Sequence, residues 1–163
     1  MVLRPGGLMD LMEFDFHVYD DHYRRIELDA SRVAEPWWPR WLTFLNAAAR
    51  NRGGDVDAAT YIHSWTANHR AFEDVQYREF WVPTSPWRKD TEFQIRMGMS
   101  MRDDILAFLK SGRPLLLGSG VPEDIVDELE RNAAFELTSA RGRYYMRLQC
   151  VWARKRPGGG RHP

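Results

Sequence analysis

The sequence has little cysteine, no net charge and no long apolar run. Cys150 is the single cysteine among 163 residues, so an internal disulfide is excluded and a reducing compartment is favoured. Lysine plus arginine and aspartate plus glutamate number 23 each, so no charge excess points to nucleic acid or an acidic membrane as a partner. Neither a secretory leader nor a stretch of ~18 apolar residues is seen. We therefore expect a protein of the cytoplasm or nucleus that binds neither nucleic acid nor membrane.

The composition is that of a folded domain. Hydrophobic residues make up 44% and aromatic residues 13% of the chain, which argues against disorder. At 163 residues the default is one domain. We expect it to cover residues 1–155, followed by a flexible Gly- and Pro-rich tail over 156–163.

Apolar periodicity predicts three strands and about four helices. A first strand is expected over Leu8–Tyr19, covered on both faces at first and on one face later, with a turn at Asp20–Tyr23 and a return at Ile26–Asp29. Helices are expected from Glu35 to Gly53, from Asp55 or Asp57 to His69, from Thr91 to Lys110, and from Pro122 through Leu137. Strands are expected over Asp74–Val82 and from Tyr145 to Lys155, the last antiparallel and buried on one side.

The chain opens on a turn that leads directly into a strand. In Leu3–Asp10 (LRPGGLMD), Pro5 fixes the second position of a type II turn and Gly6 supplies the positive φ of the third. Ala71–Val75 (AFEDV), Pro83–Asp90 (PTSPWRKD) and Tyr145–Lys155 follow in order.

These four segments resemble the C-terminal half of class I methyltransferases that use S-adenosylmethionine, in the version found in fungal regulators of secondary metabolism. One departure is that Phe72 follows Ala71 directly, where the family pattern has a glycine. The resemblance covers Leu3 to Lys155. It implies an α/β fold, namely a partial class I methyltransferase (Rossmann-like) fold with the last three strands: parallel strand five, then six and antiparallel seven.

The resemblance implies S-adenosylmethionine as the cofactor of the fold but not of this chain alone. In the family, an acidic residue and a Gly-x-Gly-x-Gly loop that hold the cofactor precede the matched segment. Pro114–Asp124 has the shape of such a loop, with Gly118 and Gly120, but lacks the third glycine and the preceding acid. We interpret it as a connection between helices and expect the isolated chain to be an inactive methyltransferase.

Aromatic side chains are the best candidates for substrate binding. The resemblance places the regions of Trp37 and Trp87 on the substrate side of the family's pocket, where aromatic walls suit an apolar acceptor or a methyl sulfonium. Tyr19 is a further candidate for substrate binding. For Trp37 and Trp87, a position in the hydrophobic core and a position in the pocket are both open. For Trp38, Trp41 and Trp81, a position in the core is favoured.

His17 is the candidate catalytic base, because the carboxyl ends of parallel strands carry the site in open α/β sheets. The alternative is a solvated strand residue. His22 is expected in a turn and His162 in the tail. His63 and His69 are not spaced as an i, i+4 metal pair, so no metal site is expected.

Two hypotheses from different classes follow. In the first, the chain is part of a methyltransferase and the methyl transfer belongs to a longer protein. In the second, it is a non-catalytic interaction protein that forms a homodimer or binds a partner through the strand edge near Leu8–Phe14.

Overall fold

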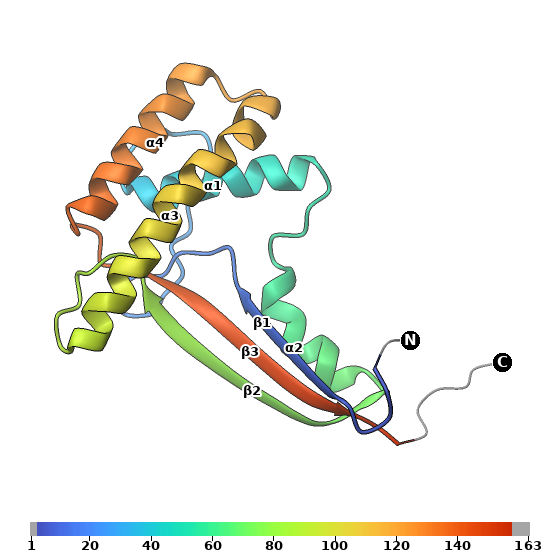
Figure 1. Ribbon diagram of the computed structural model, residues 1–163. Helices are drawn as coiled ribbons and strands as arrows, with labels where there is room; N and C mark the ends of the chain where they lie inside the picture. The colour runs from blue at the N-terminus through green and yellow to red at the C-terminus, as the bar shows by residue number, and fades with distance from the viewer. Residues whose placement is uncertain (1–2, 158–163) are drawn as a thin grey trace. The chain divides into compact units, whose positions relative to one another are not determined.

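The computed structural model describes residues 3–157 of the chain. Its elements, in order, are β1 (Leu8–Phe14), α1 (Trp37–Asn51), α2 (Ala58–Asn68), β2 (Phe72–Pro83), α3 (Glu92–Gly118), α4 (Glu123–Thr138) and β3 (Tyr145–Lys155) (Figure 1). They divide into two compact units. The first unit comprises the described parts of 1–15, 57–80 and 148–163, and the second comprises Phe16–Val56 and Trp81–Arg147.

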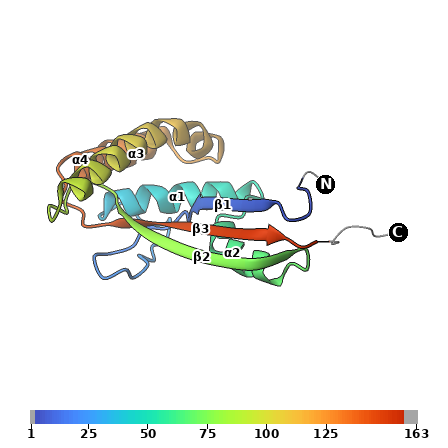
Figure 2. The same ribbon diagram turned by 60° about the horizontal axis from the view of Figure 1, so that its bottom comes forward.

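The first unit contains β1 and most of β2 and β3, and the strand order in the sheet is β1-β3-β2 (Figure 2). β1 and β3 are antiparallel, with Leu8 opposite Arg154 and Phe14 opposite Leu148. The opening turn forms as predicted: Gly6 has a φ of 73° and its N–H donates to the Lys155 carbonyl at 2.8 Å. The structure is therefore α/β, with a three-stranded antiparallel sheet and four helices, which are the numbers of strands and helices that were predicted.

The predicted first strand is longer than β1, and its predicted burial exceeds that of β1. β1 ends at Phe14, five residues before the predicted end, whereas its place at the edge of the sheet agrees with the strand edge expected near Leu8–Phe14. Leu8 and Met12 are 57% and 63% exposed, so the prediction of a strand covered on both faces is wrong. The apolar residues were correctly identified, but their run does not reveal whether another element covers them.

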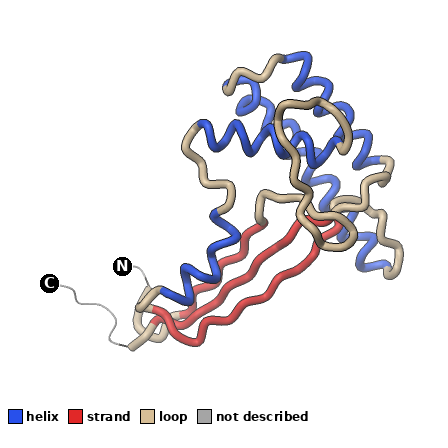
Figure 3. Tube along the Cα trace, turned by 180° about the vertical axis from the view of Figure 1, so that it is seen from behind, coloured by secondary structure: helices blue, strands red, loops and turns tan. Residues whose placement is uncertain are grey.

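The last strand is more buried than expected. Residues from both alternating sets of β3 are buried, including Cys150 at 6% and Val151 at 0% exposure. The prediction of one solvated face is wrong because β3 is the central strand and α2 lies along the sheet (Figure 3). A side-chain bond from Gln149 Nε2 to the Ala59 carbonyl, at 2.9 Å, joins β3 to α2.

The second unit is built on α1, α3 and α4, which pack against one another (Figure 1). Trp38 and Trp41 are completely buried and their rings stack at 5.7 Å, so the prediction that they are core is confirmed. The predicted stripe of α4 is also confirmed, since Val126, Leu129 and Ala133 have no exposed surface.

The predicted start of α3 is confirmed, but its predicted end is wrong. Thr91 caps its start, because the Thr91 hydroxyl accepts from the Gln94 N–H at 3.2 Å. The helix does not stop at Lys110 but continues to Gly118, with Pro114 inside it. The added turns bury Leu116 completely, and this packing outweighs the backbone hydrogen bond that a proline cannot make.

Candidate functional site

A tight turn after β1 brings two arms of the second unit together. The Asp20 carboxylate accepts the backbone N–H groups of Arg24 and His22 at 2.9 Å, and these bonds, that from Arg24 foremost, lower the pKa of Asp20. Tyr19 on the first arm forms an antiparallel bridge with Arg25 on the second. The predicted turn is thus confirmed, although the return arm over 26–29 is not a strand.

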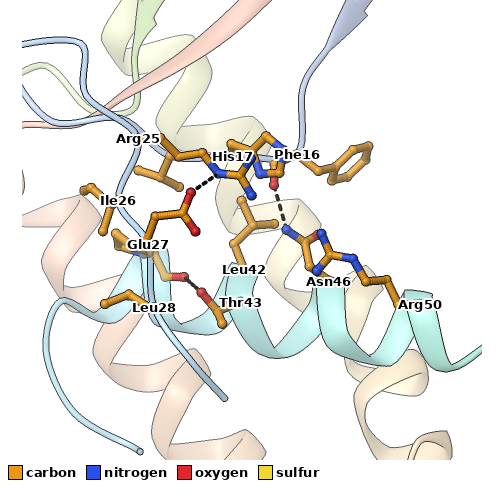
Figure 4. Close-up of a pocket in the computed structure, with 12 residues that line it drawn as sticks. Phe16, His17, Arg25, Ile26, Glu27, Leu28, Leu42, Thr43, Asn46 and Arg50 are labelled. Atoms are coloured by element: carbon orange, nitrogen blue, oxygen red, sulfur yellow. Dashed lines mark hydrogen bonds and ion pairs between the residues drawn. The ribbon is translucent and has the colours of Figure 1, made fainter. Parts of the chain in front are cut away.

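The two arms and α1 line a partly open cavity of about 100 Å³ (Figure 4). His17, only 5% exposed, lines it from the first arm. Asn46 of α1 fixes that arm, because its Nδ2 donates to the Phe16 carbonyl at 2.7 Å. The alternative of a solvated His17 is therefore wrong: the imidazole is a buried side chain on a cavity wall.

The cavity wall carries charge at its outer side. Arg25 and Arg50 line it from the second arm and from α1, and Arg25 Nε lies 2.9 Å from Glu27 Oε1. The second arm is held further along by Arg40, a buried side chain of α1. Its guanidinium donates to the carbonyl of Asp29 at 2.6 Å, so the arm is fixed to α1 beyond the cavity.

A cluster of aromatic rings lies on the other side of the turn. Trp81 packs edge-on against Tyr19 at 4.9 Å, and Tyr23 lies 4.8 Å from Trp81 and 5.0 Å from Tyr145. Trp87 packs edge-on against Tyr145 at 5.2 Å. These centroid distances are in the range where aromatic pairs attract each other, so the five rings form one cluster.

Cations border this aromatic cluster. Arg147 lies over the rings of Tyr19 and Trp81, at 5.5 and 5.9 Å from their centroids. Arg88 Nη1 donates to the Tyr145 hydroxyl at 2.9 Å, and Arg88 also pairs with Asp90, a contact that raises the pKa of the guanidinium. An open depression of about 470 Å³ lies against Trp87, Arg88 and Tyr145.

Trp37 lies elsewhere, at the start of α1. The Glu136 carboxylate of α4 accepts the Trp38 N–H at 2.8 Å and the Tyr144 hydroxyl at 3.2 Å. Burial raises the pKa of Glu136 above its ordinary value, and the bonds to the two tryptophan N–H groups and Tyr144 only partly oppose this. Trp37 and Glu136 line a second depression of about 520 Å³ with Phe135.

The structure brings some of the predicted residues together and separates others. Tyr19 and Trp87 belong to one aromatic cluster, His17 lines the cavity, and Trp37 belongs to the Glu136 depression. Gly118 and Gly120 flank the turn between α3 and α4, as the interpretation of a helix connection predicts. His162 lies outside the described residues.

Other site residues were missed by sequence reasoning. Asn46 and Arg50 lie on one face of α1, four residues apart, and that spacing was the available signal. Tyr145 was placed on the correct strand, but no pattern indicated that it would join two tryptophan-containing segments. Glu136 carried no signal at all, since an acidic residue within a helix is normally solvated.

The described residues contain neither a cluster of metal ligands nor a membrane-spanning helix. Over residues 3–157, no group of three or more potential ligand side chains could hold a metal ion. His63 stacks on the Tyr77 ring at 4.8 Å instead. Within the same range, no helix has the length and apolar character needed to cross a membrane.

Comparison with known proteins points to a longer relative. No protein-family model matches the chain. It is 49% identical over 153 residues to the secondary metabolism regulator laeA of Coprinopsis cinerea, covering 94% of this chain and 38% of the regulator. The chain thus spans less than two fifths of the length of this curated relative. Nearly the whole chain is similar to one part of a fungal secondary-metabolism regulator, which agrees with the resemblance in the sequence motifs.

Proposed function

We propose that the chain is the C-terminal part of a methyltransferase-like fold of the secondary-metabolism regulator type. The observation that carries the proposal is the 49% identity to the Coprinopsis cinerea regulator over 94% of the chain. The antiparallel last strand supports it, because the resemblance implies an antiparallel strand seven. The cytoplasm or nucleus is the compartment that we propose for it.

In this proposal the chain supplies the acceptor side of a methyl-transfer site. His17 is the base that removes a proton from the acceptor, and its place on a cavity wall supports that role. Tyr19 and Trp87, joined through one aromatic cluster, form apolar walls for the acceptor. Trp37 contributes from the separate depression at Glu136.

The residues present do not fit S-adenosylmethionine. A cofactor loop of this kind follows a strand and opens a helix, so that backbone N–H groups can approach the ligand. Gly118 is instead the last residue of α3, and Gly120 lies in the turn that follows it. We propose that the cofactor is bound by other parts of a longer protein and that the isolated chain transfers no methyl group.

Isothermal titration tests the cofactor statement. Titrating the chain with S-adenosylmethionine should give no saturable heat, because micromolar binding needs about −8 kcal/mol and the groups that would supply it are missing. A stoichiometric micromolar isotherm would overturn it and direct attention to Gly118 and Gly120.

A chimera tests the acceptor side. This chain should replace the aligned part of the Coprinopsis cinerea regulator and restore secondary metabolism in a strain that lacks the regulator. The His17→Ala chimera should keep its melting temperature and cofactor binding but lose this restoration. Full restoration by the His17→Ala chimera contradicts the proposed role of His17.

A second candidate function is pairing through the edge of β1. The observation that favours it is that Leu8, Leu11 and Met12 on this edge strand are exposed. An exposed apolar edge strand recruits another strand, from a second copy or from a protein partner. Light scattering of the chain over a range of concentrations distinguishes this function from the first.

A further inference from the structure

We propose that the depression at Glu136 binds the methylated ammonium group of a small organic cation. Three aromatic residues and two carboxylates line it, namely Trp37, Phe135, Tyr144, Glu35 and Glu136. All of them belong to the second unit. The inference deepens the proposed function and rests on it, since it names the group by which an acceptor is anchored at Trp37. Binding itself needs no methyl donor and can be measured on the chain as it is.

The aromatic rings of the depression are available to a ligand. Trp37 comes from the start of α1, Phe135 from α4 and Tyr144 from the segment before β3. In the part of the chain that the structure describes, none of these three rings packs against another aromatic ring. The Phe135 side chain is 57% exposed. Because an aromatic face attracts a cation through its quadrupole, three such rings around one depression suit a positively charged ligand.

One of the rings already holds a cation. The guanidinium of Arg141 lies 5.2 Å from the centroid of the Phe135 ring, within the ~6 Å range of a cation–π contact. Arg141 is exposed, and within residues 3–157 it forms no ion pair that would fix it there. A long side chain loses conformational entropy when it is held in one position, so a dissolved cation can displace it. The wall of the depression therefore attracts positive charge, and the resident cation is replaceable.

The carboxylates of the depression have no ion pair within the described residues. Glu136 accepts from backbone N–H groups of α1, that of Trp38 at 2.8 Å, and from the Tyr144 hydroxyl at 3.2 Å, and all of these donors are neutral. Burial foremost, and the charge of Glu35 in addition, raise the pKa of Glu136. The two carboxylates thus repel each other without a paired cation, and a bound cation would relieve this repulsion.

The hydrogen bonds of Glu136 decide which cation fits. A carboxylate has about four lone-pair sites, and Glu136 already uses most of them for α1 and Tyr144. A primary ammonium brings three N–H donors that need acceptors, and it is strongly hydrated. A quaternary ammonium brings no donor and is held by charge and by ring faces. Because the depression is partly open, only the methylated end of the ligand has to enter it.

The Tyr144 ring is in place before a ligand binds. Its hydroxyl donates to Glu136 Oε1 at 3.2 Å. The ring also lies against the chain at Gly142, where an added Cβ atom would come 2.0 Å from it. Since this wall is already ordered, binding costs little further ordering at Tyr144.

The experiment is a titration of the isotopically labelled chain with choline, followed by NMR. Choline should shift the signals of Trp37, Phe135 and Tyr144 saturably, with a Kd in the millimolar range because the site is open. The neutral analogue of choline, in which a carbon atom replaces the nitrogen, has the same shape and should bind at least about tenfold more weakly. Butylammonium, a primary ammonium, should bind at least about threefold more weakly than choline.

Four variants complete the test. Phe135→Leu keeps an apolar side chain without the ring, and Glu35→Gln removes one negative charge; each should weaken choline binding about threefold. Arg141→Gln removes the resident cation and should strengthen binding about threefold. Asp104→Asn removes a negative charge at an exposed position of α3 outside the depression and should leave the Kd unchanged. Melting temperatures confirm that all four variants fold.

The outcomes separate this inference from the proposed function. Absence of saturable choline shifts, equal binding of the neutral analogue, an unchanged Kd in Phe135→Leu and Glu35→Gln, or weaker binding by Arg141→Gln overturns the ammonium site. Binding of butylammonium as tight as that of choline overturns the preference for a methylated group. None of these results affects the cofactor titration or the chimera, which test the proposed function. Conversely, choline binding with the expected pattern stands even where the chimera fails.

Discussion

Single glycines set how closely α3 approaches its neighbours. A Cβ atom on Gly112 would lie 2.7 Å from the ring of Trp41, which is completely buried. A Cβ on Gly98 would lie 2.5 Å from the Ser85 carbonyl oxygen. Neither neighbour can move easily, because one is a rigid core ring and the other is backbone.

Gly112→Ala should therefore lower the free energy of unfolding by about 1–3 kcal/mol, the usual cost of overpacking a core. Urea denaturation measures it. Gly118→Ala is the matched control in the same helix, since its Cβ would meet only the end of the flexible Arg52 side chain. That control should be neutral or stabilising by up to about 1 kcal/mol, the gain from replacing glycine in a helix. Equal losses for both variants would contradict the close approach at Trp41.

Glu136 should make stability depend on pH. Burial raises its folded-state pKa above the ordinary value of 4.5, so the folded protein binds this proton more readily than the unfolded chain does. The associated stability is fully present below pH 4.5 and is lost as the pH rises through the folded-state pKa.

Glu136→Gln removes this dependence, because the amide is neutral at every pH. The difference in unfolding free energy between variant and wild type should move in favour of the variant as the pH rises from 4 to 8. Chemical denaturation at several pH values measures the difference. A flat difference between pH 4 and 8 would rule out Glu136 as the cause.

At the scale of elements, the apolar stripe predicted for α4 forms part of the hydrophobic core. Leu129 has no exposed surface, so Leu129→Ala should cost about 2–5 kcal/mol of unfolding free energy through lost contacts and a new cavity. Arg131→Ala, at an exposed position two residues on, should stay within about 0.5 kcal/mol. Thermal or urea denaturation of the pair tests this, and a small loss for Leu129→Ala would place the stripe outside the cooperative core.

Amphipathic helices were predictable because their periodicity is local. The start of α1 at Pro36 and its end before Gly53, and the Thr91 cap of α3, all follow from residues within a few positions. The end of α3 was not predictable in this way. Pro114 is a local stop signal, and it is overruled by the burial of Leu116, which depends on other helices.

The candidate site shows the same limit. The position of His17 after a strand was predictable, but its burial was not, because α1 and Asn46 come from a distant part of the sequence. Tyr19 and Trp87 were predicted as substrate-binding residues, and their membership in one cluster depends on Tyr145 on the last strand. Contacts between distant segments produce no local pattern in the sequence, so the sequence did not predict them.

At the scale of the whole molecule, the exposed edge of β1 matters most. Its exposed Leu8 and Met12 should cause the chain to associate at high concentration. Met12→Lys should shift the chain toward monomer, because a charged side chain disfavours strand pairing at an edge. Light scattering measures the mass. Met99→Lys, at an exposed methionine of α3, is the control and should associate as the wild type does. A monomeric wild-type chain at all concentrations would contradict pairing with a second copy.

The pairing of β1 with β3 also bears on how the protein is made. Leu8 has its strand partner at Arg154, so β1 leaves the ribosome long before the strand that completes its ladder. Until then β1 has no β3 to pair with, while α1, α3 and α4 can already pack together. Pairing between strands so far apart in the sequence slows folding, and it leaves an apolar segment exposed to which chaperones can bind. Translation speed and chaperone supply should therefore limit the yield of the sheet-containing unit more than that of the helical one.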